Sequence, residues 1–346
     1  MLERQPISDR GPFDPFRALP GNFAPRDVQD LMAYPFFSLA KSRRTAPLDF
    51  TSGPVTIRVE AVAEHGMATI WDADVLIWAA SQIVEARDAG LRTSRLIVAT
   101  PYEILKFVGR GTSMRDYRRL KAALDRLQST TICTSLRERA EGRRHRFSWL
   151  NEWKERTDRD GKADGIELII PDWFYQSVLD DALVLTIDHA YFALTGGLDR
   201  WLYRHVRKHG GRQRRGWRFE FRHLHRKSGA MSPFNRFAFE LRDIIRRQPL
   251  PGYALYLEVD IGGRTLLAFE PVLPGASNGE GLVLSGTPRR VPSGTAGTCQ
   301  REPKRDPTLV NISGIRIANL DSNIESNLKA QVRTACEPER KRRGRP

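Results

Sequence analysis

The stretch TPYEILKFVGRGTSMRDYRRLKAALDRLQSTTICTSL, residues 100–136, constrains the fold more than any other part of the chain. Its pattern predicts a short helix, a glycine-containing turn, a longer basic helix and then a strand. At the start of the first helix, Thr100, Pro101 and Glu103 form the signature of a capped N-terminus. This order of elements is typical of a winged helix-turn-helix, a module that binds DNA.

The second helix of this pair divides its residues between an apolar and a basic face. Its inward face carries residues that recur at helical spacing, namely Tyr117, Leu120, Leu124 and Leu127. Ser113 is placed to cap the helix and is itself a candidate DNA contact. The outward candidates for phosphate and base contacts are Arg115, Arg118, Arg119 and Arg126. A solvated basic face on an ordinary helix pair would show the same pattern, so this stretch alone leaves both interpretations open.

The charge of the chain points to a polyanionic partner. Among 346 residues, 56 are Lys or Arg and 41 are Asp or Glu, which gives a formal net charge of +15. This charge alone does not distinguish nucleic acid from anionic lipid. No apolar run is long enough for a membrane span, and the start lacks the apolar core of a signal peptide. Three widely spaced cysteines form neither a zinc pattern nor a disulfide framework, so we expect a cytoplasmic protein without metal or cofactor.

The length allows about two domains, and the patterns divide the chain into four parts. Residues 1–50 are rich in Pro, Arg and Asp and are expected to be mostly disordered, apart from an apolar cluster, YPFFSL at 34–39, that docks on the first domain or on a partner. Residues 51–182 form the first winged-helix domain. Its expected wing is the basic hairpin RERAEGRRHR at 137–146, whose candidate phosphate contacts are Arg143, Arg144 and Arg146.

Residues 183–273 are expected to repeat the plan as a second winged-helix domain, with strands at 253–259 and 265–272. Within it, residues 200–247 hold 15 Lys and Arg but only three acidic residues, a density that favours phosphate binding. The candidate DNA contacts are Arg226, Lys227, Asn235, Arg236, Arg242 and Arg246. After Pro274 apolar periodicity is lost, and residues 274–346 are expected to be a disordered basic tail.

One constellation suggests a different chemistry. His223-Leu224-His225 matches the spacing with which rolling-circle nickases hold a divalent metal, and Tyr253 and Tyr256 follow where a nucleophile would be needed. The signal is weak, because the three residues also fit the first helix of the second helix-turn-helix, with Leu224 inward. We therefore predict no catalytic residues, and a metal-dependent nickase remains the less favoured alternative.

Several motifs resemble the plasmid replication initiator protein A family of proteobacteria. They are GMATIWDADVLIWAASQIVEARDAG (66–90), TPYEILKFVGRGTS (100–113), YRRLKAALDRLQSTTICTS (117–135), YPFFSLAK (34–41), LHRKSG (224–229) and LPGYALYLE (250–258). The resemblance spans about residues 34–272. It implies a non-enzymatic initiator that binds direct repeats at a plasmid origin through tandem winged helices, helps to open the origin and recruits a host initiator and helicase. It also implies that the chain represses its own promoter as a homodimer.

The sequence thus predicts an α+β chain of two tandem winged helix-turn-helix domains that binds double-stranded origin DNA. The first alternative is a transcriptional repressor of the same fold without a role in replication. Only the family resemblance favours initiation over repression, because a fold does not determine a function.

Overall fold

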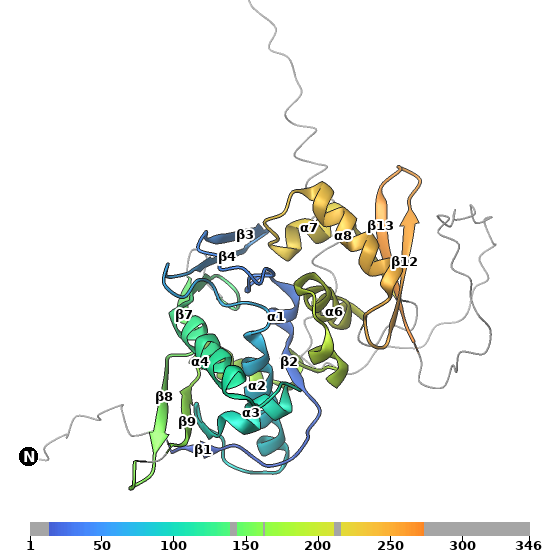
Figure 1. The fold of residues 1–346 in the computed structure, drawn as a ribbon. Coiled ribbons are helices and arrows are strands. Elements are labelled where there is room, and N and C mark those ends of the chain that lie inside the picture. The colour runs from blue at the N-terminus through green and yellow to red at the C-terminus, as the bar shows by residue number, and fades with distance from the viewer. Residues whose placement is uncertain (1–13, 139–143, 162, 211–215, 273–346) are drawn as a thin grey trace, which may run out of the picture. The chain divides into compact units, whose positions relative to one another are not determined.

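The computed structural model of the chain describes residues 14–138, 144–161, 163–210 and 216–272. Its fold is mixed α+β, with helices packed against several small sheets (Figure 1). The elements of the first half are β1 (Phe16–Arg17), β2 (Arg26–Val28), α1 (Gln29–Ala33), β3 (Leu48–Ser52), β4 (Val55–Glu60), α2 (Ala73–Asp88), β5 (Leu96–Ala99), α3 (Pro101–Phe107), α4 (Met114–Ser129), β6 (Thr131–Thr134), β7 (His145–Ser148), β8 (Glu152–Thr157), β9 (Ala163–Ile169) and α5 (Asp172–Leu179).

The second half repeats part of this order. Its elements are β10 (Val184–Thr186), α6 (Gly197–Gly210), β11 (Trp217–Glu220), α7 (Phe221–Ser228), α8 (Phe234–Arg247), β12 (Tyr253–Val259) and β13 (Thr265–Pro271). From α6 onward the order helix, strand, helix, helix, strand, strand matches α2, β5, α3, α4, β8 and β9. The strand order matches too, since β5-β9-β8 in the first half corresponds to β11-β13-β12 in the second.

The two helices expected at residues 100–129 form where the sequence predicts them, as α3 and α4. The Thr100 hydroxyl accepts from the Glu103 N–H at 3.2 Å, and the Glu103 carboxylate accepts from the Thr100 N–H at 2.7 Å, which completes the capping box. On α4, Leu120, Leu124 and Leu127 are buried. This apolar stripe holds the helix on the core and leaves its opposite side to solvent.

The two helices expected in the second half are present as α7 and α8. In α7, Leu224 is fully buried, and Gly229 ends the helix with a φ of 63°, a left-handed conformation that glycine adopts without strain. In α8, Phe237 and Leu241 face the core and are fully buried. Helix α8 begins at Phe234, one residue later than the Ser232-Pro233 cap pattern suggests.

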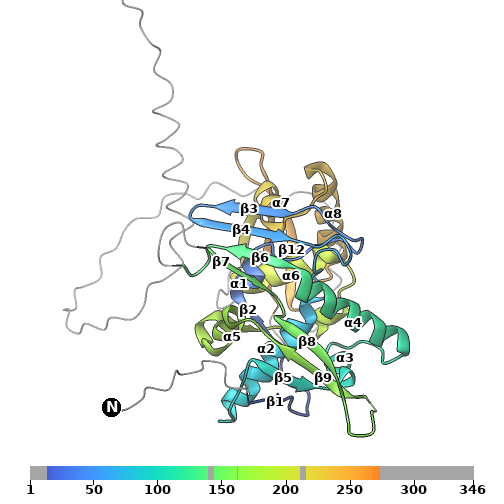
Figure 2. The same ribbon diagram turned by 90° about the vertical axis from the view of Figure 1, so that its left-hand side faces the viewer.

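The basic segment expected to form the wing of the first half lies between strands of a different sheet from β5. Strands β6 and β7, which flank the basic 137–146 segment, belong to a separate sheet with the order β3-β4-β6-β7 (Figure 2). The hairpin that joins β5 is β8–β9, with Leu168 of β9 opposite Ile97 of β5. Sequence pattern locates strands but not their neighbours, because strand pairing depends on distant segments.

The N-terminal segment differs from the expectation of disorder over the part that is described. From residue 14 onward it forms β1, β2, α1 and β3, and β1 pairs in parallel with β5. Val28 and Met32 have no exposed surface. Phe37 stacks on Trp149 with ring centroids 5.0 Å apart, so the YPFFSL cluster docks within the chain itself. Its apolar side chains, rather than its overall polar composition, determine this outcome.

Buried ion pairs connect α6 to the first half. Arg204 donates to both carboxylate oxygens of Asp27, at 2.6 and 3.0 Å, and each side chain is only 2% exposed. Arg200 and Arg110 share the carboxylate of Asp74, at 2.7 and 2.8 Å. Burial raises the pKa of Asp74, while the two guanidinium groups oppose that rise. These contacts hold α6 against β2 and the start of α2.

Across the described ranges, no helix is both long and apolar enough to span a membrane. The expected basic tail at 274–346 lies outside the described residues.

Candidate nucleic-acid interface

The outward side of α4 presents three exposed arginines. They are Arg115, Arg118 and Arg119. Arg119 lies 3.5 Å from Asp116, and more than half of its side chain remains exposed. Ser113, at the start of the helix, donates from its N–H and its hydroxyl to the Asp116 carboxylate at 3.2 and 2.6 Å, so its side chain serves the helix cap. These hydrogen bonds lower the pKa of Asp116. Arg115 and Arg118 have no ion-pair partner among the described residues and remain available to a ligand.

Arg126 differs from the three exposed arginines of α4, because an ion pair holds its side chain. Its guanidinium donates to both carboxylate oxygens of the buried Asp72, at 2.8 and 2.7 Å. Hydrogen bonding to that carboxylate raises the pKa of Arg126, and its side chain is 26% exposed. A bidentate, partly buried pair of this kind fixes both side chains. Arg126 therefore anchors α4 to the start of α2, with its charge balanced by Asp72.

A recess of about 640 Å³ follows the side of α4 that carries Arg119, Ala122 and Arg126. We call it the basic groove. Its lining also includes Lys41 and Arg43 from the N-terminal segment, two residues that the sequence pattern did not single out. The basic run AKSRR directly after YPFFSL was the available signal.

Positive charge exceeds negative charge in the basic groove. Its basic lining residues are Lys41, Arg43, Arg110, Arg119, Arg126 and Arg200. The neighbouring carboxylates are those of Asp72, Asp74 and Asp116. Two of the cations share one carboxylate at Asp74, and the ammonium of Lys41 lies over the Trp71 ring at 5.4 Å. Such a groove attracts phosphate groups.

Among the described arginines of the 137–146 segment, Arg146 lies in β7 of the β3-β4-β6-β7 sheet, apart from the sheet that contains β5. Arg144 is exposed, and Arg146 is 64% exposed at 3.5 Å from Glu60. Arg143 lies outside the described residues. At the β8–β9 hairpin, by contrast, Lys154 is paired with Glu167 at 2.9 Å and Arg159 is exposed near the turn.

The outward side of α8 presents a row that runs along the helix, which we call the α8 ridge. Its residues are Asn235, Phe239, Arg242 and Arg246, all of them exposed. The spacing of four, three and four residues places them on one line along the helix. Arg242 lies over the Phe221 ring at 5.5 Å, and Arg246 pairs with Asp243 at 2.5 Å while 75% of its side chain stays exposed.

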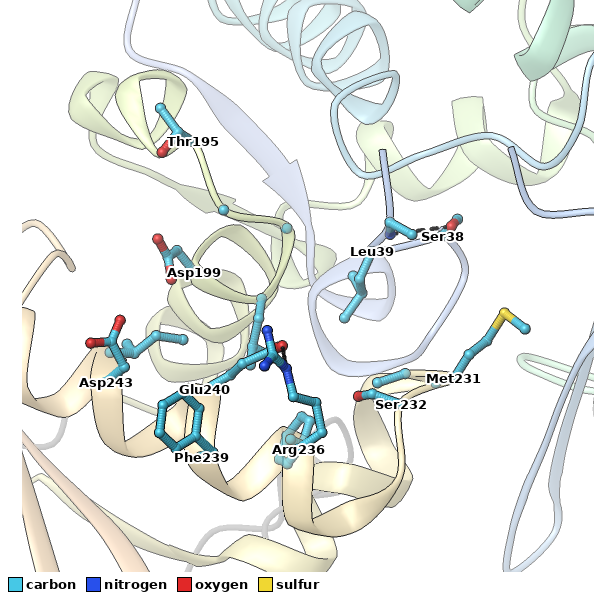
Figure 3. Close-up of a pocket in the computed structure, with 18 of the residues that line it drawn as sticks. Ser38, Leu39, Thr195, Asp199, Met231, Ser232, Arg236, Phe239, Glu240 and Asp243 are labelled. Atoms are coloured by element: carbon cyan, nitrogen blue, oxygen red, sulfur yellow. Dashed lines mark hydrogen bonds and ion pairs between the residues drawn. The ribbon is translucent and has the colours of Figure 1, made fainter. Parts of the chain in front are cut away.

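Next to the α8 ridge, α8 faces a pocket of about 660 Å³ that it shares with the start of α6, and Phe239 of the ridge is one of its lining residues (Figure 3). Glu240 and Asp243 project from α8 at this pocket, and Asp199 projects from α6. Arg236 pairs with Glu240 at 2.6 Å, and Arg247 pairs with Asp199 at 3.1 Å. Acidic groups therefore balance the arginines on this side, and the α8 ridge is the more cationic surface.

The remaining candidates belong to α7. Arg226 is exposed. The ammonium of Lys227 lies 4.7 Å from the centroid of the Tyr34 ring and 5.5 Å from that of Phe50, so this side chain packs on the N-terminal segment. His225 hydrogen-bonds through Nε2 to the Ser232 carbonyl at 2.8 Å. Within the described ranges, no cluster of three potential metal ligands occurs.

Comparison with known proteins identifies the family. The model of the family described as Replication initiator protein A matches residues 26–255. The chain belongs to this family. A protein of Wigglesworthia glossinidia brevipalpis described as "Putative replication protein" is 31% identical over 226 residues, which cover 64% of this chain and 81% of the relative. The family resemblance drawn from the sequence motifs is thereby confirmed.

The fold has a counterpart among solved structures. The crystal structure of domains 2 and 3 of RctB matches with a TM-score of 0.51, covering 68% of this chain and 94% of that chain at 16% identity. At this identity the likeness concerns the fold alone. The match covers 68% of the chain and therefore spans both halves of the fold.

Proposed function

We propose that the protein is a plasmid replication initiator that binds direct repeats at its origin through two winged helices, in domains 51–182 and 183–273. The observation that carries the proposal is the internal repeat. Apart from β6 and β7, which have no counterpart in the second half, the order from α2 to β9 recurs from α6 to β13 with the strand order β5-β9-β8 matching β11-β13-β12, and in both halves the second helix of the pair presents exposed cations. This order is typical of winged helices, in which that helix enters the major groove.

In this proposal α4 and α8 are the recognition helices. Figure 2 places both on the same side of the described chain. Two helices in successive major grooves contact sites roughly 10 bp apart on one face of the duplex. Arg115 and Arg118 of α4 and the α8 ridge approach base edges, while the basic groove takes backbone phosphates beside α4. Arg126 supports α4 rather than contacting DNA, because Asp72 occupies its guanidinium.

The proposal assigns the other candidates according to their positions. The wing of the first domain is the β8–β9 hairpin, and that of the second is β12–β13. Arg226 contacts a phosphate from the helix that precedes recognition helix α8. Arg144 and Arg146 contribute to long-range attraction from their separate sheet. The chain acts without catalysis, in the cytoplasm, and recruits a host initiator and helicase once the origin is bound.

Membership of the family favours initiation over a second candidate, a repressor of the same fold. An initiator also represses its own promoter when it binds there as a homodimer. A plasmid fragment with this gene and its flanking DNA, placed in a host without the plasmid, separates the two. Autonomous replication that is lost on a stop codon in the gene supports initiation. Binding without replication leaves repression as the function.

The DNA-binding part of the proposal is tested by the salt dependence of binding to random duplex. Each phosphate neutralised contributes about 0.9 to the slope of log K against log salt. The double variant Lys41→Gln/Arg43→Gln should reduce that slope by about two if both side chains reach phosphates. Arg92→Gln is the matched control, because this 97% exposed arginine lies outside the groove. Equal slopes for wild type and the double variant would exclude the groove as a phosphate site.

A further inference from the structure

We propose that Phe239 of α8 recognises a thymine through contact between its ring and the C5-methyl group. The inference rests on the proposed function, since it requires α8 to enter the major groove. There each thymine presents its methyl group beside the O4 acceptor, and apolar side chains distinguish thymine by packing on that methyl.

The exposure of Phe239 is the first observation. Phe239 is 63% exposed, whereas Phe237, two residues earlier, is fully buried. Phe237 therefore packs α8 on the core, and Phe239 is not part of that core. An exposed aromatic ring on a helix gains free energy when a ligand covers it.

The surroundings of the ring identify the ligand. Phe239 is the second residue of the α8 ridge, one turn after Asn235 and one turn before Arg242. Asn is suited to bidentate contact with adenine, and Arg to guanine or phosphate. A single apolar ring within a row of such side chains matches one methyl group on the floor of a polar groove.

A protein partner fits this surface less well. Stable protein interfaces bury about 800 Å² on each partner and have an apolar centre. Figure 3 shows Phe239 beside the charged side chains of Arg236, Glu240 and Asp243, and Arg236 lies 5.8 Å from its ring. On this side the ring of Phe239 is therefore bordered by ion pairs, which suits a small apolar group.

The experiment uses the full chain and a duplex enriched by the wild type from a random pool. Each thymine is replaced singly by deoxyuridine, which removes only the methyl group. For wild type, replacement of the contacted thymine should weaken binding about fourfold, the factor that corresponds to about 0.8 kcal/mol for one buried carbon. For Phe239→Ala, the same replacement should have no effect, and thymine and uracil should bind equally at that position.

Met231→Ala is the matched control, because Met231 is 66% exposed in the turn before α8. This variant should retain the fourfold preference for thymine. If every replacement affects wild type and Phe239→Ala equally, the inference is overturned while sequence-specific binding stands. If the wild type enriches no sequence, the proposed function fails and the inference fails with it. A peptide or second copy that binds wild type but not Phe239→Ala, without coupling to thymine, would assign the ring to a protein partner.

Discussion

Removal of the Asp27 carboxylate should destabilise the protein strongly. Asp27 lies in β2, in the N-terminal segment, and Arg204 lies in α6 of the second half. Both side chains are 2% exposed, and Arg204 donates to both carboxylate oxygens. The carboxylate also accepts from the N–H of Val28 at 2.9 Å. Asp27→Ala therefore leaves a buried guanidinium with its principal partner missing.

The magnitude follows from that burial. Breaking a buried ion pair by removing one partner costs about 3–5 kcal/mol, mainly because an uncompensated charge stays in the interior. With an m-value of about 3 kcal/mol per molar urea, the midpoint of unfolding should fall by about 1–2 M. The double variant Asp27→Leu/Arg204→Met removes both charges and should recover most of the loss.

Urea unfolding followed by tryptophan fluorescence measures these midpoints. Asp49→Ala is the control, because Asp49 pairs with Arg58 at 3.0 Å on the surface, where Asp49 is 63% exposed. This variant should leave the midpoint unchanged, since exposed pairs are screened by water and salt. A midpoint for Asp27→Ala equal to that of wild type would refute the reasoning, because it would mean that water or another group solvates Arg204 in the folded chain.

Three further predictions concern stability and chemistry. Burial lowers the pKa of His205 well below its usual value. The free energy of unfolding should therefore fall as the pH drops below about 6.5, because only the unfolded chain gains the proton there. The slope should be about 1.4 kcal/mol per pH unit, and His205→Phe should remove it. Leu124→Ala should cost about 2–5 kcal/mol in urea unfolding, since Leu124 is fully buried on the inward face of α4; a loss below 1 kcal/mol would contradict that packing. Supercoiled origin plasmid should stay intact with Mg²⁺ or Mn²⁺, and nicking that depends on His223 and His225 would instead favour the nickase.

Local signals predicted the helices of this fold well. The Thr100 cap and the Leu120–Leu127 stripe depend on residues three or four positions apart, and such spacing is visible in one sequence. The pairing of strands was not predictable in the same way. Leu96–Ala99 is a short apolar run without periodicity, and its partner in β9 lies some seventy residues later, opposite Ile97 at Leu168. This is why the pattern did not show that β8–β9, and not β6–β7, is the hairpin that joins β5.

The candidate site shows the same division. Helical spacing placed Arg115, Arg118 and Arg119 on an exposed side of α4. It also included Arg126, because spacing along one helix carries no information about Asp72, 54 residues earlier. Composition suggested disorder for the first fifty residues, yet the segment brings Lys41 to the wall of the basic groove. Side chains that meet across distant segments were the part that sequence pattern could not supply.

A hydroxyl-radical footprint on the enriched duplex tests the central claim of tandem recognition most directly. Wild type should protect two patches on one face of the duplex, roughly 10 bp apart. Arg118→Ala should weaken protection at one patch and Asn235→Ala at the other, because the two residues lie on different recognition helices. A single protected patch, or loss at the same patch with both variants, would contradict binding through α4 and α8 together.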